Sequence, residues 1–176
     1  MNKIKLRVII VLLLCSLASV AIADEEALVQ ERMVSIRAEG KQLDGLVIGA
    51  QARLDFIYVD AALVEALRTP SGFPDWLRWH AKDFASEELK GGALFVLRIE
   101  TYNPWTFDPM KISVAGYALK EEDILTKPAY VPKGDLPSRF EGSLSFRVPG
   151  LKLKPGQEII ISYGEDKATF RVPKGR

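Results

Sequence analysis

The chain contains a single histidine, His80, which limits the nucleophilic chemistry that the sequence can support. Mechanisms that use a serine or cysteine nucleophile with a histidine base would all have to use His80. No serine lies in a G-x-S-x-G context, and no S-x-x-K sequence occurs. At helical spacing His80 falls within the apolar stripe of Trp76, Leu77 and Phe84, which indicates a histidine packed against the core. The alternative is a general base or a pH-sensitive contact at the edge of a pocket.

The residue types in the sequence give little support for a metal site or a phosphate-binding site. The only cysteine, Cys15, lies in an N-terminal apolar run, and a structural zinc site with one histidine would need mostly carboxylates. Glu121, Glu122 and Asp123 could contribute to a calcium site, but the spaced acidic loop with its glycine is missing. Three adjacent acids more often form a solvated turn. The sequence lacks G-x-G-x-x-G and the P-loop lysine, so we expect no cofactor and no catalytic site.

Aromatic residues are the remaining candidates for binding. Tyr102, Trp105 and Phe107 lie in a loop that contains two prolines. A loop that displays tryptophan offers a large, rigid contact area for a sugar or a peptide. The alternative is that Trp105 tucks under the loop and plugs one end of the fold. Trp79 lies at the margin of the helical stripe around His80, where it either contacts a partner or is partly buried.

The first 23 residues have the pattern of a secretory signal peptide. Lys3, Lys5 and Arg7 are followed by a nearly unbroken apolar run over residues 8–20, and residues 21–23 (Ala-Ile-Ala) fit the small-x-small cleavage pattern. The run is too short to cross a bilayer comfortably. We therefore expect cleavage after residue 23 and a location outside the cytoplasm, either periplasmic or secreted. Cys15 leaves with the signal, and Leu14 before it argues against lipidation.

The charge distribution is asymmetric along the predicted mature chain. Residues 24–176 carry 21 Lys+Arg and 23 Asp+Glu, a net charge of −2. Residues 24–123 have a net charge of −7, whereas residues 124–176 have a net charge of +5. A basic C-terminal region could meet anionic lipid, a cell-wall polymer or an acidic partner. Alternatively, Arg147, Lys167 and Arg171 occupy the solvent face of the last strands and prevent edge pairing. The slightly acidic mature chain and its predicted location make nucleic acid an improbable partner.

The middle of the chain predicts a helical segment over about residues 61–90. Asp60 can cap a short helix over residues 61–68, and a second helix is expected from Pro74 to Lys90, where two glycines end it. Residues 24–39 fit both helical and strand periods, and we favour a short acidic lead followed by a strand from about Met33. Gly40 to Gly45 resembles a turn, and residues 46–48 and 52–59 have the character of strands.

The rest of the chain alternates with period 2. The expected strands cover residues 94–101, 111–115, 143–148, 158–163 and 167–172, with proline- and glycine-containing turns between them. This spacing is typical of a mainly β fold, a two-layer antiparallel β-sandwich with immunoglobulin-like strand spacing and an inserted or capping helical segment. The alternative is an α+β domain whose helices cover one face of a single antiparallel sheet. The length of residues 24–176 predicts a single domain.

The functional expectation follows from the missing catalytic constellation and from a fold that usually presents loops and edges. We expect an exported, non-catalytic interaction module of the bacterial cell envelope that binds a protein partner or the envelope surface. A small-ligand module for sugar or lipid is the alternative, with Trp105 or the helix of Trp76 and Trp79 lining its pocket. A hydrolase that uses His80 or paired acids is the third hypothesis.

Overall fold

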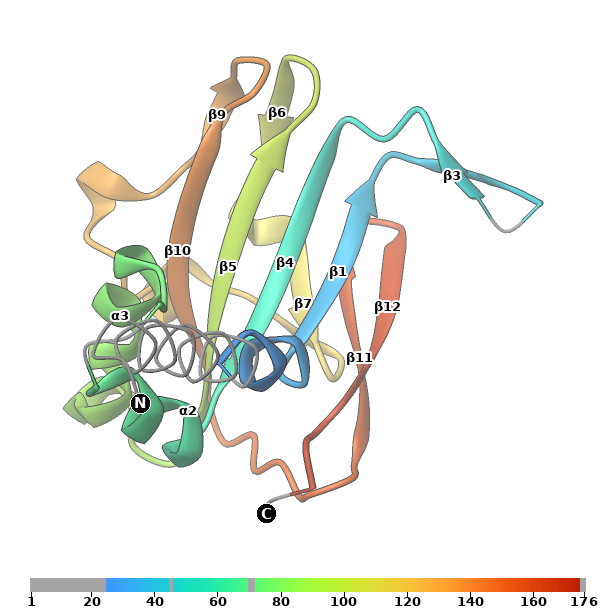
Figure 1. The fold of residues 1–176 in the computed structure, drawn as a ribbon. Helices are drawn as coiled ribbons and strands as arrows, with labels where there is room; N and C mark the ends of the chain where they lie inside the picture. Colours follow the sequence, from blue (N-terminus) through green and yellow to red (C-terminus); the bar gives the residue numbers. More distant parts are fainter. Residues whose placement is uncertain (1–24, 45, 70–71, 175–176) are drawn as a thin grey trace, which may run out of the picture.

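The computed structural model describes residues 25–44, 46–69 and 72–174, so the predicted signal peptide lies outside the described residues. The fold is mainly β, with antiparallel sheets and a few short helices (Figure 1). The first four-stranded sheet has the order β1-β4-β5-β10: β1 Met33–Ala38, β4 Ala52–Val59, β5 Ala93–Thr101 and β10 Glu141–Val148. The second has the order β12-β11-β7-β8: β12 Asp166–Arg171, β11 Glu158–Tyr163, β7 Ile112–Val114 and β8 Tyr117–Ala118.

One apolar core lies between the two four-stranded sheets. Alternate residues of β4, β5, β10 and β12 point inward, as the period-2 pattern predicts. Phe95 stacks on Phe146 with ring centroids 5.7 Å apart, and Phe170 of the second sheet meets Phe95 edge-on at 6.5 Å. All three rings are buried. The period-2 alternation of these strands therefore corresponds to one face that is buried in the core.

The helices cover part of the other face of the first sheet, which we call the outer face. Apolar residues from β4 and β5, including Ile57, Val59 and Val96, point away from the first core. They form a second buried cluster with Leu63 of α2 (Ala61–Leu67) and Leu77 of α3 (Asp75–Ala81). The predicted helical segment therefore covers a face of one sheet, and the second sheet covers that sheet's opposite face (Figure 1).

The predicted single helix from Pro74 to Lys90 is wrong in its second half. The α-helix α3 ends at Ala81, and two short 3₁₀ turns follow, η1 (Lys82–Ala85) and η2 (Glu87–Leu89). Ser86 between them is extended, with φ −76° and ψ 152°. The Ser145 hydroxyl on β10 donates a hydrogen bond of 2.6 Å to Asp83 Oδ2. This contact anchors the chain to β10 just where the α-helix stops.

Several short segments outside the two four-stranded sheets differ from the sequence-based expectation. Residues 25–30 are helical, whereas the strand expected from Met33 is confirmed as β1. The segment of Tyr102, Trp105 and Phe107, which the sequence predicts to be a loop, contains the strand β6 (Trp105–Phe107), and β6 pairs antiparallel with β9 (Gly134–Leu136). A second short pair, β2 (Lys41–Leu43) with β3 (Leu46–Ile48), projects beyond the two sheets in Figure 1. The remaining 3₁₀ turns are η3 Pro109–Lys111, η4 Glu121–Asp123 and η5 Pro128–Tyr130.

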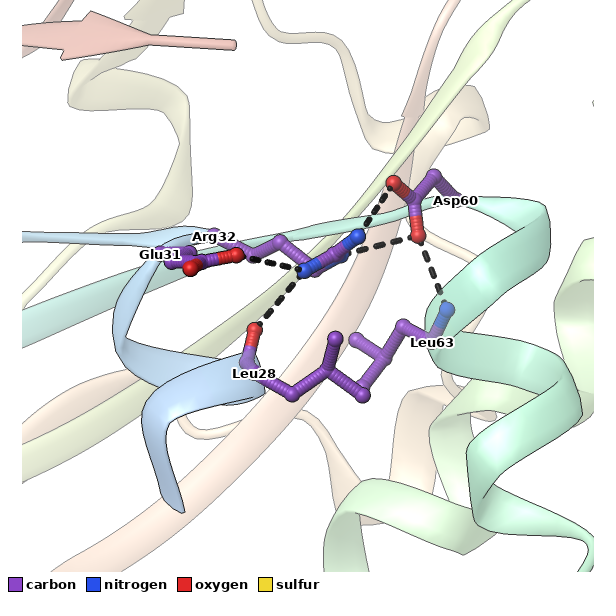
Figure 2. Close-up of polar contacts among 5 residues, drawn as sticks. All are labelled: Leu28, Glu31, Arg32, Asp60 and Leu63. Carbon is purple, nitrogen blue, oxygen red and sulfur yellow. Dashed lines mark hydrogen bonds and ion pairs between the residues drawn. The ribbon is translucent and has the colours of Figure 1, made fainter. Parts of the chain in front are cut away.

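A buried ion pair joins the N-terminal helical turn to α2 (Figure 2). Arg32 is only 4% exposed, and its Nε and Nη2 donate to the two carboxylate oxygens of Asp60 at 2.9 and 3.0 Å. Arg32 Nη1 also donates to the Leu28 carbonyl at 3.0 Å. Asp60 Oδ1 accepts the Leu63 N–H at 2.9 Å, which confirms Asp60 as the N-cap of α2. One carboxylate thus fixes both the arginine and the helix start.

Candidate functional site

The β2–β3 hairpin carries an apolar surface on one of its two faces. The register pairs Lys41 with Ile48 and Leu43 with Leu46. Since side chains alternate between faces, these four residues share one face of the hairpin. Leu43 is 58% exposed, Leu46 69% and Ile48 49%. Val47 points the other way and is only half-buried. The described chain therefore presents three large aliphatic side chains side by side to solvent.

The local sequence explains the hairpin. Asp44 has φ +47°, a left-handed conformation that Asp tolerates better than most residues, and glycine follows it at position 45. At the base of the hairpin, a Cβ atom on residue 40 would collide with the Val47 side chain, so Gly40 allows the two strands to approach. The hairpin is thus a built element of the chain, with a one-sided apolar surface.

Two of the four aromatic residues predicted to contact a ligand or partner are buried. Trp105 is 6% exposed and Phe107 is fully buried, so neither ring forms an exposed platform on a loop. The reason is the β6–β9 pairing, which directs both rings inward onto Tyr163, at centroid distances of 5.2 Å for Trp105 and 5.6 Å for Phe107. Tyr102 remains 42% exposed. The alternative interpretation, in which Trp105 tucks under its loop, describes the structure.

Trp79 lies on α3, whereas the other three predicted residues lie just after β5 and in β6. It is 46% exposed on α3, and its ring meets the exposed ring of Tyr130 edge-on at 6.2 Å. The structure therefore does not bring Tyr102, Trp105, Phe107 and Trp79 into one site. Trp76, three residues earlier on α3, is half-buried beneath the guanidinium of Arg98, which lies 5.8 Å from the centre of its ring.

An open hollow borders the buried Trp105 at the end of the sheets where β6 and β9 lie. We call it the Trp105 hollow, and its volume is about 370 Å³. Its polar lining comes from five different segments: Glu39, Gln51, Thr106, Lys111 and Asp135. The indole Nε1–H of Trp105 is buried and has no hydrogen-bond acceptor among the described residues. Buried tryptophan N–H groups usually find an acceptor, so this group stands out.

His80 is buried in a polar network rather than placed in an open pocket. It is 2% exposed, with Nδ1 3.2 Å from Ser145 Oγ and Nε2 2.9 Å from Ser143 Oγ. Burial lowers the pKa of His80 below its ordinary value, although nearby Asp83 opposes the shift. Ser145 stands between His80 and Asp83, an order different from the nucleophile, base and carboxylate of a catalytic triad. Both serines lie within β10, away from the sharp turns that expose catalytic serines. The network holds α3 against β10.

The acidic run splits between surface and interior. Glu121 and Glu122 are exposed, and Glu121 Oε1 pairs with Lys133 at 3.0 Å. Asp123 is fully buried, against the expectation of a solvated turn, because it accepts the Tyr117 hydroxyl at 2.7 Å and lies 3.4 Å from Arg147 Nε. Within residues 25–44, 46–69 and 72–174, no group of three histidine, cysteine or acidic residues is arranged to hold a metal ion.

The three basic residues predicted to lie on the solvent face of the last strands differ in their exposure. Lys167 and Arg171 are exposed on β12, on the side of the second sheet that faces solvent, as one of the two interpretations predicts. Arg147 is instead half-buried, since its Nη1 donates to the Glu88 carbonyl in addition to the Asp123 contact. These three residues do not form one patch.

Comparison of the chain with protein-family models, with curated proteins and with solved structures gives no match. Among the helices that the structure describes, none is both long and apolar enough to cross a membrane. The strand expected over residues 46–48 is confirmed as β3, whereas the segment expected to be a turn contains the strand β2. What sequence reasoning missed is that the two strands pair as a hairpin, although an Asp-Gly pair between alternating apolar residues is a recognised hairpin pattern.

Proposed function

We propose that this protein is an exported, non-catalytic module of the bacterial cell envelope that binds a protein partner through the β2–β3 hairpin. The observation that carries the proposal is the shared face of Leu43, Leu46 and Ile48, all about half or more exposed. Single exposed aliphatic residues are common on soluble proteins, but a contiguous group of them often marks an interaction surface. A projecting hairpin presents that group where a partner can surround it.

The chemistry of the hairpin defines the partner surface that fits it. Burial of a leucine or isoleucine side chain contributes about 1.5–3 kcal/mol, so an apolar groove that covers all three would supply a substantial part of a binding free energy. Lys41 shares the same face and would meet an acidic residue at the rim of that groove. We therefore expect a partner with an apolar groove and a carboxylate beside it.

The finer fold assignment and the location belong to the same proposal. Two antiparallel four-stranded sheets with a shared core support a β-sandwich with immunoglobulin-like strand spacing, to which the helices form an additional layer. The pattern of residues 1–23 supports export to the periplasm or beyond. In this location a thiol-free mature chain avoids unwanted disulfides.

The test is a comparison of variants in affinity capture from an envelope fraction. The double substitution Leu43→Ser/Leu46→Ser removes most of the apolar face, and the expected result is loss of one specific partner that the parent recovers. Ile160→Ser is the matched control, because Ile160 is also an exposed aliphatic residue, 55% exposed, but lies on β11. The control should retain the partner.

Capture alone does not support the proposal, because exposed aliphatic residues bind many proteins weakly. The partner must bind the purified protein with saturation, and the hairpin variant must lose this binding while its urea denaturation matches the parent. Equal capture by parent, hairpin variant and Ile160→Ser would contradict the proposal. Recovery of only a second copy of this chain would replace the partner by self-association.

A further inference from the structure

A pocket on the outer face of the first sheet lies between the helical turn of residues 25–30 and α3, above β4 and β5. We call it the Asp55 pocket, and its volume of about 320 Å³ lies at the lower end of the range of small-molecule sites. We propose that it binds a small organic cation, a primary ammonium group on a short hydrocarbon chain. The residues of the β2–β3 hairpin do not line this pocket.

The apolar walls of the pocket are part of the second buried cluster. Six apolar side chains of the lining are buried or half-buried, and they come from four different elements or segments: Val29, Met33, Ile57, Phe73, Trp76 and Leu77. The Glu25 carboxylate accepts the Gly72 N–H at 2.8 Å, which ties the helical turn to the segment that leads into α3. The walls are therefore in place before any ligand binds, and they can cover a hydrocarbon chain.

A buried carboxylate in the floor of the pocket indicates the polar end of the ligand. Asp55 of β4 lines the pocket and is only 5% exposed. Its Oδ1 accepts the Ser35 hydroxyl at 2.6 Å and Arg53 Nε at 2.8 Å. Its Oδ2 has no donor among the described residues and, unlike Trp105 Nε1, keeps accessible surface. An ionised carboxylate only accepts hydrogen bonds, so the ligand group that reaches this oxygen must be a donor.

The ion pairs around the pocket leave an excess of negative charge. Each of the two arginines in the lining is already paired with a carboxylate, Arg53 with Asp55 at 2.8 Å and Arg98 with Glu141 at 3.1 Å. The two further acids of the lining, at positions 25 and 26, have no cationic partner among the described residues. An anionic ligand would have to displace a carboxylate from an arginine and would then meet these acids. A cationic ligand is attracted by them.

A primary ammonium group fits this combination better than other donors do. It carries three N–H donors, so one can reach Asp55 Oδ2 while the others face the acids of the lining. Hydrogen bonds between a cation and a carboxylate are about twice as strong as those between neutral groups, which favours the ammonium over a hydroxyl. A quaternary ammonium group has no N–H and would leave Oδ2 without a donor.

The test is NMR titration of the ¹⁵N-labelled protein at neutral pH with three probes of the same chain length: hexylamine, hexanol and hexanoate. The indole N–H signal of Trp76, which lines the pocket, is the reporter, and Trp76→Phe assigns it. Hexylamine should shift this signal with saturation, while the Trp105 signal stays in place. Its affinity should exceed that of hexanol and of hexanoate by about tenfold or more, since only the ammonium gains a charge-assisted hydrogen bond.

Two variants test the two parts of the pocket separately. Asp55→Asn keeps the size of the side chain but removes its charge, and it should weaken hexylamine binding by about tenfold. Asp135→Asn is the matched control, because Asp135 also accepts a cross-strand hydroxyl at 2.6 Å but does not line the pocket. Val29→Phe narrows the pocket without a change at Asp55, and it should weaken hexylamine binding as well. Urea denaturation of each variant checks that it is folded.

No saturable shift of the Trp76 signal with hexylamine overturns the inference, as does binding of hexanol or hexanoate with equal or higher affinity. Equal affinity of the parent and Asp55→Asn, or of the parent and Val29→Phe, overturns it too. Leu43→Ser/Leu46→Ser should leave the affinity for hexylamine unchanged, which separates this inference from the proposed hairpin function.

Discussion

Replacement of Asp60 by alanine should destabilise the protein strongly, because one carboxylate performs two tasks. It accepts two hydrogen bonds from Arg32, which is 4% exposed, and it caps α2 through the Leu63 N–H (Figure 2). Arg32 would keep one bond to the Leu28 carbonyl and a longer contact of 3.7 Å to Glu31. Its charge would stay largely buried, and the only counter-ion left to it would be the exposed carboxylate of Glu31.

The magnitude follows from the two losses. Removal of a capping side chain typically costs about 1 kcal/mol. Removal of one partner of a buried ion pair costs about 3–5 kcal/mol, because the other charge is left without compensation. The Asp60 side chain is 24% exposed, so water can partly replace it, and we take the lower end of that range. The expected loss in the free energy of unfolding is about 4 kcal/mol.

Urea denaturation followed by circular dichroism measures the loss, and two further variants test its cause. Arg32→Met in the Asp60→Ala background removes the stranded charge, so it should restore most of the loss except the contribution of the cap, about 1 kcal/mol. Glu65→Ala is the control, because its ion pair with Arg68 is 71% exposed on both sides and should contribute less than about 1 kcal/mol. A loss below about 1.5 kcal/mol for Asp60→Ala, or no recovery in the double variant, would refute the reasoning.

Three further predictions follow from burial and charge. Phe146→Ala and Phe170→Ala should each lower the free energy of unfolding by about 3–5 kcal/mol, since both rings are buried in the core between the sheets; values near zero in denaturant melts would contradict this packing. Because burial lowers the pKa of His80 from its ordinary 6.5, the unfolded chain binds more protons, so stability should fall as the pH drops below about 6.5 and continue to fall towards the folded-state pKa. The slope should reach at most about 1.4 kcal/mol per pH unit and should disappear in His80→Asn, as measured by melts across this range. Leu43→Ser/Leu46→Ser should change the free energy of unfolding by less than about 0.5 kcal/mol per substitution, because both side chains are exposed, and a large loss would show that the hairpin packs against the body.

The alternating strands were predictable because their pattern reflects burial directly. In β10, Leu144, Phe146 and Val148 face the core, as the sequence indicates. The burial of His80 was also predictable from its place in the α3 stripe. Its partners Ser143 and Ser145 were not, since they lie more than 60 positions further along the chain and meet it only when α3 packs on β10.

The candidate site was harder to predict because it depends on pairing between distant segments. Whether Trp105 displays or buries its ring is decided by β9, which lies about 30 residues later and pairs Leu136 with Trp105. The sequence between them contains no hairpin pattern that would indicate this pairing. The opposite holds for the β2–β3 hairpin, where the local Asp-Gly pattern indicates the turn, although the strand β2 before it was not expected. Which of its faces would be left uncovered depends on the rest of the fold.

Site-specific photo-crosslinking in the bacterial envelope tests the central claim most directly. A photoreactive residue placed at position 46 should give one discrete adduct with a protein partner, and the same residue at position 160 should give none. Both positions replace exposed aliphatic side chains, 69% and 55% exposed, so they differ mainly in their place on the molecule. An absence of adducts at position 46, or the same adducts at both positions, would contradict a partner-binding hairpin.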